Sequence, residues 1–220
     1  MNKENVKKLI EEIGKEKIIA ATKYISSEKM EELYSLGITN FGENRTDSFL
    51  EKYEKLSHLN ITWHFIGHLQ RNKAEEIINK IVVLHSLDSI KLAKIIDEKR
   101  NRPLDVYIEI KMTPNEKKSG VKLESLSSFI EEIKKYPKIN VIGFMTMTDV
   151  DSDDDDKRRI FKKIKELAFL YGYKCLSMGM SDDYKIALEE GSTSVRLGRI
   201  LYSEEDYKDE YKSYFKEGEY

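Results

Sequence analysis

The feature that most constrains the fold of this chain is a regular alternation of short apolar runs with longer segments of helical apolar spacing. The alternation occurs eight times along the sequence. Each strand-and-helix unit is about 20 to 30 residues long, which is typical of a parallel barrel with a helix after every strand. The sequence therefore predicts an α/β fold, a single (β/α)8 TIM barrel that spans residues 1–220 as one domain.

The expected strands are apolar runs bounded by glycine, serine or charged residues, at 18–23, 39–44, 62–67, 82–86, 105–111, 141–147, 175–180 and 194–198. The expected helices are at about 2–15 (an N-terminal helix), 26–36, 45–56, 70–80, 89–99, 123–136, 153–171 and 184–190. A charged, tyrosine-rich C-terminal tail covers about 203–220. The alternative is an open doubly wound sheet, but that fold normally has a GxGxxG turn after an early strand, and this sequence has none.

Composition limits the possible partners and the compartment. The chain has 38 Lys and Arg against 40 Asp and Glu, a net charge of −2, so no basic field predicts nucleic-acid binding. The charged N-terminus and the absence of an apolar run of about 18 residues predict a cytoplasmic protein that does not bind membranes. A single cysteine, Cys175, excludes an intramolecular disulfide, and its apolar context predicts a core residue rather than a reactive thiol.

Two neighbouring strand ends predict an anion site. The run 175–180 ends at Ser181-Asp182-Asp183, which is expected to begin the next helix, and the run 194–198 ends in Gly198. Strand ends rich in glycine and serine that open onto helix N-termini offer backbone N–H groups to a phosphate. The active face of a parallel barrel is the face where the strands end, so this site is expected at the mouth.

Lys23 ends the first expected strand, and its amine is expected in the same mouth. Desolvation and nearby cations can make such an amine a nucleophile toward aldehydes. A lysine that extends its charge to solvent is the alternative on position alone. A phosphate site and a reactive amine together are the two groups needed to hold pyridoxal 5′-phosphate (PLP).

Arg196 belongs to the last expected strand. A guanidinium beside the pyridine nitrogen would keep that nitrogen unprotonated and weaken the ring as an electron sink. The alternative is an arginine paired with a carboxylate at the rim. A transition-metal site is not expected, because the four histidines are dispersed and lack the clustered ligands that such a metal needs.

Several motifs, in this order along the chain, resemble the YggS/PLPBP (PROSC) family of pyridoxal phosphate homeostasis proteins. They are ATK (21–23), FGEN (41–44), WHFIGHLQ (63–70) followed by Asn72-Lys73, KSG (118–120), GFMTM (143–147), LSMGMSDD (176–183) and GST-x-VR-x-G (191–198). The resemblance covers about residues 18 to 207 and implies a barrel similar to the N-terminal domain of alanine racemase.

The resemblance also implies the roles of individual residues. Lys23 would hold PLP as an aldimine, a Schiff base. The remaining cofactor-binding residues implied are Ser177 and Ser181, with the backbone of Met178, Gly179 and Met180, for the phosphate, helped by Gly198 and Arg199; Arg196 facing the pyridine nitrogen; Asn44 and His64 near the cofactor; and Met145 under the ring.

The function implied by the resemblance is vitamin B6 homeostasis, meaning storage, buffering or delivery of PLP, with no established turnover and no catalytic residue. Apo-enzymes that need PLP are possible transient partners, and the protein is expected to be a monomer. The alternative is a PLP-dependent amino-acid racemase with weak or specialised activity. Racemases of this fold take a second base from a separate β-domain of a partner subunit, and the chain ends before such a domain, which argues against turnover but leaves a slow residual reaction open.

Two positions depart from the family pattern. Arg199 stands where the family usually has a small hydroxyl residue, and Lys111 stands where it commonly has Asn, which puts a second amine near the mouth. Lys117 and Lys118 are read either as transient acceptors of the aldehyde or as part of a basic loop. The acidic run at 149–156 is expected to be a solvated loop whose last acids begin the following helix, not a calcium site.

Overall fold

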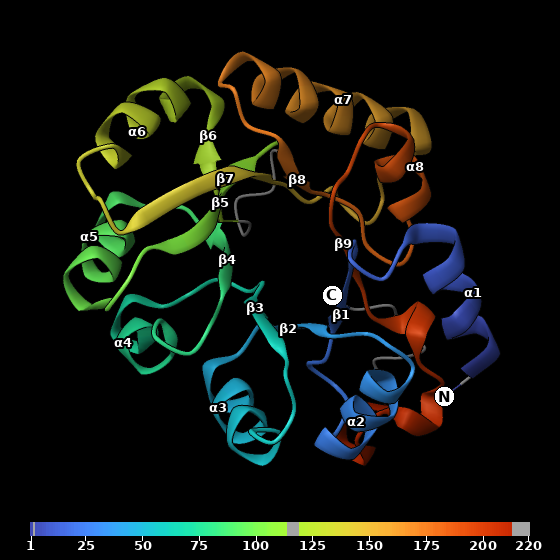
Figure 1. Cartoon of the computed structure of the whole chain (residues 1–220). Helices are drawn as coiled ribbons and strands as arrows, with labels where there is room; N and C mark the ends of the chain where they lie inside the picture. Colours follow the sequence, from blue (N-terminus) through green and yellow to red (C-terminus); the bar gives the residue numbers. More distant parts are fainter. Residues whose placement is uncertain (2, 114–118, 213–220) are drawn as a thin grey trace.

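The computed structural model describes residues 1, 3–113 and 119–212. At its centre, eight parallel strands form a TIM barrel surrounded by helices (Figure 1). The barrel strands are β1 (Ile18–Ala21), β2 (Asn40–Glu43), β3 (Thr62–Phe65), β4 (Val83–Leu87), β5 (Leu104–Lys111), β7 (Ile139–Met145), β8 (Cys175–Ser177) and β9 (Val195–Leu197). The predicted fold class is therefore confirmed.

The strands follow one another around the barrel in the order β8-β7-β5-β4-β3-β2-β1-β9. The ring is closed between β8 and β9, where the only ladder contact among the described residues is a parallel bridge between Ser177 and Ser194. In contrast, β5 and β7 pair at six positions from Leu104 and Ile139 onward. The β8/β9 junction, called the seam below, is thus much less regular than the opposite side of the barrel.

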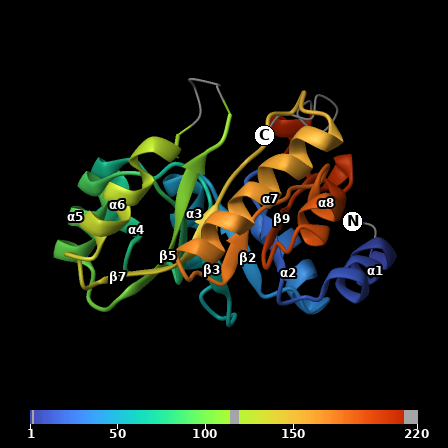
Figure 2. The ribbon, with the colours of Figure 1, turned by 90° about the horizontal axis from the view of Figure 1, so that it is seen from above.

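Helices cover the outside of the ring. They are α1 (Lys3–Ile13), α2 (Ser27–Ser35), α3 (Thr46–Lys55), α4 (Ala74–Ile77), α5 (Ile90–Lys99), α6 (Leu126–Ile133), α7 (Asp154–Leu170) and α8 (Tyr184–Glu189). Figure 2 shows α5 and α6 at one end of the molecule and α1 and α8 at the other. Each longer helix buries one apolar stripe against the barrel, as Ile160, Phe161 and Ile164 of α7 do.

The start of α7 shows how the sequence sets an element boundary. The Asp153 side chain accepts a hydrogen bond of 2.8 Å from the backbone N–H of Asp156, and the first turn is acidic, which suits the positive end of the helix dipole. The end of the acidic run therefore begins a helix, as predicted. Cys175 is also where it was expected, partly buried against the interior cluster of Val83, Tyr107 and Met145.

Several predicted boundaries are wrong. The expected strand at 175–180 ends at Ser177, because the chain turns at Gly179, whose φ of +94° and close approach to Ala187 permit no side chain. The expected helix at 70–80 consists of the 3-10 turn η1 (Arg71–Lys73) and the short α4. No buried side chain comes from η1, so a longer helix would lack an apolar stripe.

Four short elements have no counterpart in the prediction. A two-residue strand, β6 (Val121–Lys122), pairs with Ile110 and Lys111 of β5. After β9 the chain forms the 3-10 turns η3 (Arg199–Leu201), η4 (Glu204–Asp206) and η5 (Asp209–Tyr211), and the expected tail residues 213–220 lie outside the described part. None of the described helices has the length and apolar character needed to cross a membrane.

Candidate functional site

A cavity of about 250 Å³ opens where the barrel strands end. Its wall consists of residues at or after the ends of the strands, together with the segment that follows β9: Ala21, Lys23, Tyr24, Gly42, Asn44, Ile66, Gly67, His68, Glu109, Ser119, Met147, Met180, Arg196, Gly198, Arg199, Tyr202 and Tyr207. This is the face on which parallel barrels carry their active sites.

Half of the predicted site residues line this cavity, namely Lys23, Asn44, Met180, Arg196, Gly198 and Arg199. The other half do not belong to its wall, namely His64, Met145, Ser177, Met178, Gly179 and Ser181. The second amine considered from the sequence, Lys111, ends β5 and is not part of the wall either. Lys117 and Lys118 lie outside the described residues.

Lys23 is presented by a turn that begins where β1 stops. The Thr22 carbonyl accepts a hydrogen bond of 3.2 Å from the Ile25 N–H, which closes the turn around Lys23 and Tyr24. The Lys23 Nζ lies 4.3 Å from the centroid of the Tyr24 ring, within the range of a cation–π contact. The amine is thus in the mouth of the barrel and half-buried rather than extended into bulk solvent.

Arg196 reaches from β9 across the seam into the barrel. Its Nη1 donates to the carbonyl and hydroxyl oxygens of Ser177, at 2.8 and 2.6 Å, and its Nη2 donates to the Thr146 carbonyl at 3.0 Å. Burial lowers the pKa of Arg196, and the nearby carboxylates of Asp183 and Glu109 oppose that shift. The guanidinium is therefore fixed by oxygen atoms of β8 and of the residue after β7, not by the rim carboxylate considered as an alternative.

A chain of hydrogen bonds continues from Arg196 through the barrel interior. Ser177 Oγ lies 2.8 Å from His85 Nδ1, His85 Nε2 lies 3.0 Å from His64 Nδ1, and His64 Nε2 lies 3.4 Å from Asn40 Oδ1. Asn40 Oδ1 can only accept, so His64 donates to it from Nε2 and accepts at Nδ1 from His85 Nε2. The Ser177 hydroxyl then donates to His85 Nδ1, and each histidine carries its proton on Nε2. Every member of the chain is satisfied by the next one.

Burial keeps both histidines uncharged. It lowers the pKa of His64 to about 4 and that of His85 well below its usual value, with the charges of His64 and Arg196 adding to the effect on His85. Ser177 and His64 thus lie inside the barrel. The sequence analysis expected Ser177 at the phosphate and His64 near the cofactor. Ser177 is the last residue of β8, and the contacts of its Oγ with His85 and Arg196 place its side chain on the inward face of the sheet.

Backbone donors gather at the start of η3. The N–H groups of Gly198 and Ile200 both donate to Ser181 Oγ, at 3.3 and 3.4 Å. Ser181 was expected to cap α8, and this expectation is wrong. Asp183 is the N-cap of α8, and Arg199 forms an ion pair with Asp182. These two N–H groups and Arg199 are the kind of donors that bind an anion, and an anion here would take the place of their contacts with Ser181 and Asp182.

Asn44 supplies an unusual polar atom to the wall. Its Oδ1 is buried, and it has no hydrogen-bond partner among the described residues. A buried acceptor without a donor costs about 1–3 kcal/mol. A ligand that brings a donor to this side of the cavity would remove that cost.

Glu109 and Ser119 belong to the wall but were missed from the sequence. The Ser119 hydroxyl lies 3.0 Å from both carboxylate oxygens of Glu109, which is almost fully buried. Burial raises the pKa of Glu109, and the Ser119 hydrogen bond opposes that shift. Glu109 could have been found from the sequence, because it is a charged residue within the apolar run of β5. Ser119 could not, because β6 brings it to the cavity and a strand of two residues has no recognisable sequence pattern.

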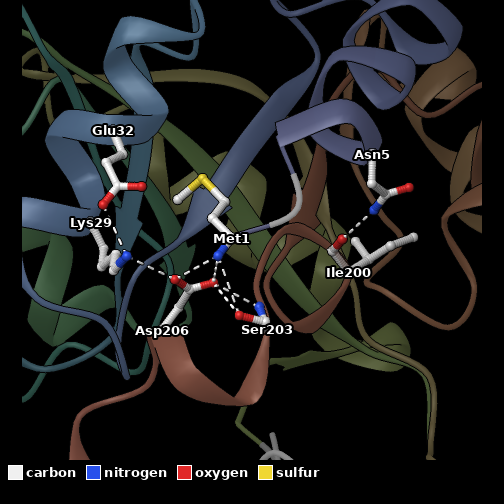
Figure 3. A network of polar contacts seen from close by, with 7 residues as sticks. All are labelled: Met1, Asn5, Lys29, Glu32, Ile200, Ser203 and Asp206. Atoms are coloured by element: carbon white, nitrogen blue, oxygen red, sulfur yellow. Dashed lines mark hydrogen bonds and ion pairs between the residues drawn. The ribbon is translucent and has the colours of Figure 1, made fainter.

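The segment after β9 adds Tyr202 and Tyr207 to the wall. Its Asp206 side chain attaches it to the N-terminus and to α2. Figure 3 shows the Met1 ammonium and Lys29 converging on the Asp206 carboxylate, at 2.8 and 3.1 Å. Burial alone would raise the pKa of Asp206, but hydrogen bonds from the terminal ammonium, Ser203 and Lys29 outweigh it and lower the pKa to about 2. The segment is thereby held against α1 and α2.

Comparison with known proteins gives consistent matches along the chain. The family described as the N-terminal domain of alanine racemase matches residues 2–206. A pyridoxal phosphate homeostasis protein of Aquifex aeolicus is 38% identical over 217 residues, which cover 93% of this chain and 95% of the relative. A protein of the same name from Pseudomonas aeruginosa is 32% identical and covers 86% and 85% of the two chains.

Solved structures resemble this fold in the same way. PipY of Synechococcus elongatus without PLP superimposes with a TM-score of 0.87 at 26% identity, covering 92% of this chain and 100% of PipY. PipY with PLP bound gives 0.85 at 26% identity, covering 91% and 99%. Alanine racemase from Corynebacterium glutamicum gives 0.73 at 17% identity, covering 91% of this chain and 59% of the racemase, a likeness of fold alone.

Proposed function

This chain belongs to the family of pyridoxal phosphate homeostasis proteins, and from that membership we propose that it binds PLP and takes part in its homeostasis. The observation that carries the proposal is that the Lys23 amine shares one cavity at the mouth of the barrel with Gly198 and Arg199 at the start of η3. Relatives that cover 93% and 86% of the chain have the name of this function, and the PipY barrel is described with PLP bound.

The described residues fit this cofactor. The Gly198 and Ile200 N–H groups, with Arg199 and Ser181, would hold the phosphate, because they converge beside the cavity. Asn44 Oδ1 is a buried acceptor that a bound ligand could satisfy. A cavity of about 250 Å³ has room for a single small ring and its substituents.

Lys23 and Arg196 would act on the ring side. When bound, PLP supplies an aldehyde that condenses with a primary amine with loss of water, and Lys23 is the amine on the wall. Arg196 has one guanidinium edge occupied by Ser177 and Thr146, so it is fixed as a cation next to the cavity. A fixed cation disfavours protonation of a neighbouring pyridine nitrogen, which supports binding without turnover.

The test is an absorption spectrum of the purified protein mixed with PLP, followed by borohydride reduction and peptide mapping. The wild type is expected to develop a visible band and to carry the reduced label on Lys23, whereas Lys23→Ala is expected to lose both. Lys111→Ala is the matched control, because Lys111 ends β5 but is not part of the wall, and it should behave as the wild type. A label on Lys111, or a full band in Lys23→Ala, would contradict the assignment.

The finer role is proposed as storage, buffering or delivery of PLP in the cytoplasm by a monomer, without turnover. Incubation of the loaded protein with an apo-enzyme that needs PLP is expected to restore that enzyme's activity, with Lys23→Ala as the negative control. Steady conversion of L-alanine to D-alanine would instead identify a racemase. A scattering mass of twice the 25.8 kDa chain would show a dimer.

A further inference from the structure

The turn that presents Lys23 lies just beyond the part of β1 that the sheet holds. Ala21 is the last residue of β1, and it pairs with Gly42 of β2. The last backbone bond to the neighbouring strand is donated by the Thr22 N–H to the Gly42 carbonyl, at 3.0 Å. The backbone from the Thr22 carbonyl onward must therefore be fixed by something other than the strand ladder.

Part of that fixation comes from the segment after β9, because the Lys208 N–H donates to the Tyr24 carbonyl at 2.9 Å and Ile25 forms a bridge with Tyr207. The Thr22 carbonyl itself is held by a buried lysine of α3. Lys52 Nζ donates to the Thr22 carbonyl at 2.5 Å and to Glu43 Oε1 at 2.5 Å. The Thr22 hydroxyl donates to the same Glu43 oxygen at 2.6 Å. All three side chains are at most 1% exposed. The carbonyl that closes the turn around Lys23 is thus held by an ammonium group.

These contacts lie on the outer side of the barrel wall, behind the cavity. Ala21 and Gly42 of β1 and β2 line the cavity, as do Lys23 and Asn44 just after these strands, and side chains alternate between the two faces of a strand. Thr22 and Glu43, each one residue earlier, accordingly meet Lys52 of α3. One cluster therefore adjoins both Lys23 and Asn44 through the backbone.

Stability alone gives little reason for such a cluster. Burial lowers the pKa of Lys52, and the attraction of Glu43 only partly opposes that shift. Glu43 Oε2 has no hydrogen-bond partner among the described residues, so the carboxylate is not fully satisfied. Buried ion pairs are often no more stabilising than apolar residues of similar volume, but they do fix geometry.

We propose that Lys52, through Glu43 and the Thr22 carbonyl, is the positioning residue that aims the Lys23 amine for covalent attachment of PLP. The inference rests on the proposed function and adds a residue outside the cavity to it. A cation held on the Thr22 carbonyl restricts the turn, and covalent attachment depends on the direction of the attacking amine. Reversible binding of the phosphate and ring depends on other residues and should not need Lys52.

The experiment separates attachment from binding by using two ligands. PLP is mixed with the protein and the rate at which the visible band develops is recorded. Pyridoxine 5′-phosphate, which has an alcohol in place of the aldehyde, is titrated calorimetrically to report binding alone. Lys52→Met is expected to slow band formation by about tenfold or more while it leaves the affinity for pyridoxine 5′-phosphate unchanged.

Lys55→Met is the matched control. Lys55 is on the same helix, its side chain is 55% exposed, and it pairs with Glu51 at the surface, so both ligands should behave as with the wild type. Lys52→Arg, which keeps a cationic donor, is expected to recover part of the rate. If Lys52→Met does not fold, Glu43→Gln is tested in its place, because glutamine keeps the shape of the Glu43 side chain and removes its charge.

Three outcomes would overturn the inference. A folded variant that forms the band as fast as Lys55→Met shows that Lys52 does not aim Lys23. Equal loss of both ligands shows that the cluster only maintains the fold of the site. A wild type that binds pyridoxine 5′-phosphate but forms no band refutes attachment to Lys23 and the inference with it, whereas one that binds neither ligand refutes the proposed function itself.

Discussion

His64 and His85 are unusual contents for a barrel interior, because layers of branched aliphatic side chains normally fill that space. Here they form a continuous hydrogen-bonded chain with Ser177 and Arg196. A buried polar chain is favourable only when each member has its partner, and this one is completed at its far end by Asn40. The hydrogen-bonded chain in the barrel interior therefore fixes the direction of the Arg196 side chain.

This chain predicts an acid-sensitive fold. Burial lowers the pKa of His64 from 6.5 to about 4, so the folded protein binds this proton less tightly than the unfolded chain does. The neutral histidine thus contributes stability above about pH 6.5 that is lost as the pH falls toward 4, on the order of 3 kcal/mol. Urea unfolding at a series of pH values between about 7 and 4 measures this loss.

His64→Gln should show a shallower fall over the same pH range, because glutamine keeps an acceptor and a donor but does not titrate. His58→Gln is the control, since His58 is 58% exposed and pairs with Glu31 at the surface. Equal slopes for the wild type and His64→Gln would show that another group causes the acid sensitivity.

At the scale of elements, the segment after β9 is a part of the cavity wall that is held in place by contacts outside the barrel sheet. It contributes Arg199 of η3 to the wall, together with Tyr202 and Tyr207 from between the 3-10 turns, and Asp206 fastens it to the rest of the protein. The pKa of Asp206 is lowered to about 2, so its contribution to stability is complete above about pH 4 and is lost only as the pH falls through 2.

Asp206→Asn is expected to loosen this segment at neutral pH and to weaken PLP binding several-fold, because the wall loses its fixed position while Lys23 is intact. Fluorescence or absorbance titration with PLP measures the change. Asp209→Asn is the matched control in η5, where the carboxylate is 94% exposed and pairs with Lys212. Identical affinities for the two variants would show that Asp206 does not shape the cavity.

The elements also show where sequence reasoning succeeds and where it stops. The apolar runs predicted all eight barrel strands, because most residues of these strands are buried, and position at a strand end predicted Lys23 and Arg196 at the mouth. It did not predict β6, which has two residues, or the Glu109–Ser119 contact that β6 creates. Contacts between segments distant in sequence leave no periodic signal.

The same limit explains the displaced serine residues. LSMGMSDD was read as a phosphate-binding run, but a turn at Gly179 divides it. Ser177 before the turn points into the barrel, and Ser181 after it accepts from the N–H groups of η3. Which serine faces the mouth is decided by the end of a three-residue strand, and strand ends are the least certain part of a sequence-based prediction.

For the molecule as a whole, the seam between β8 and β9 is the place where the barrel should open most easily. Its backbone bonds, such as Met178 N–H to the Ser194 carbonyl and Arg196 N–H to the Gly179 carbonyl, join residues outside the regular ladder. Local opening follows the regions with the fewest regular contacts. The amides of Met178 and Arg196 should therefore exchange hydrogen faster than those of β5.

Addition of PLP should slow exchange most at these two seam amides, because Met180 and Gly198 follow the two seam strands and both line the cavity. Hydrogen exchange read by NMR with and without PLP measures the effect, and the amides of β5 are the internal reference. Uniform slowing over the entire barrel would show that the seam has no special part in the response.

If bound PLP closes the seam, the amount of this protein would depend on how much PLP is present. A ligand that binds only the folded chain lowers the fraction that is unfolded, by an amount that grows with ligand concentration. Proteases remove chains mainly from the opened state, so empty copies would be degraded sooner than full ones. The number of copies in a cell would then rise and fall with the supply of the vitamin, without any change in the expression of the gene.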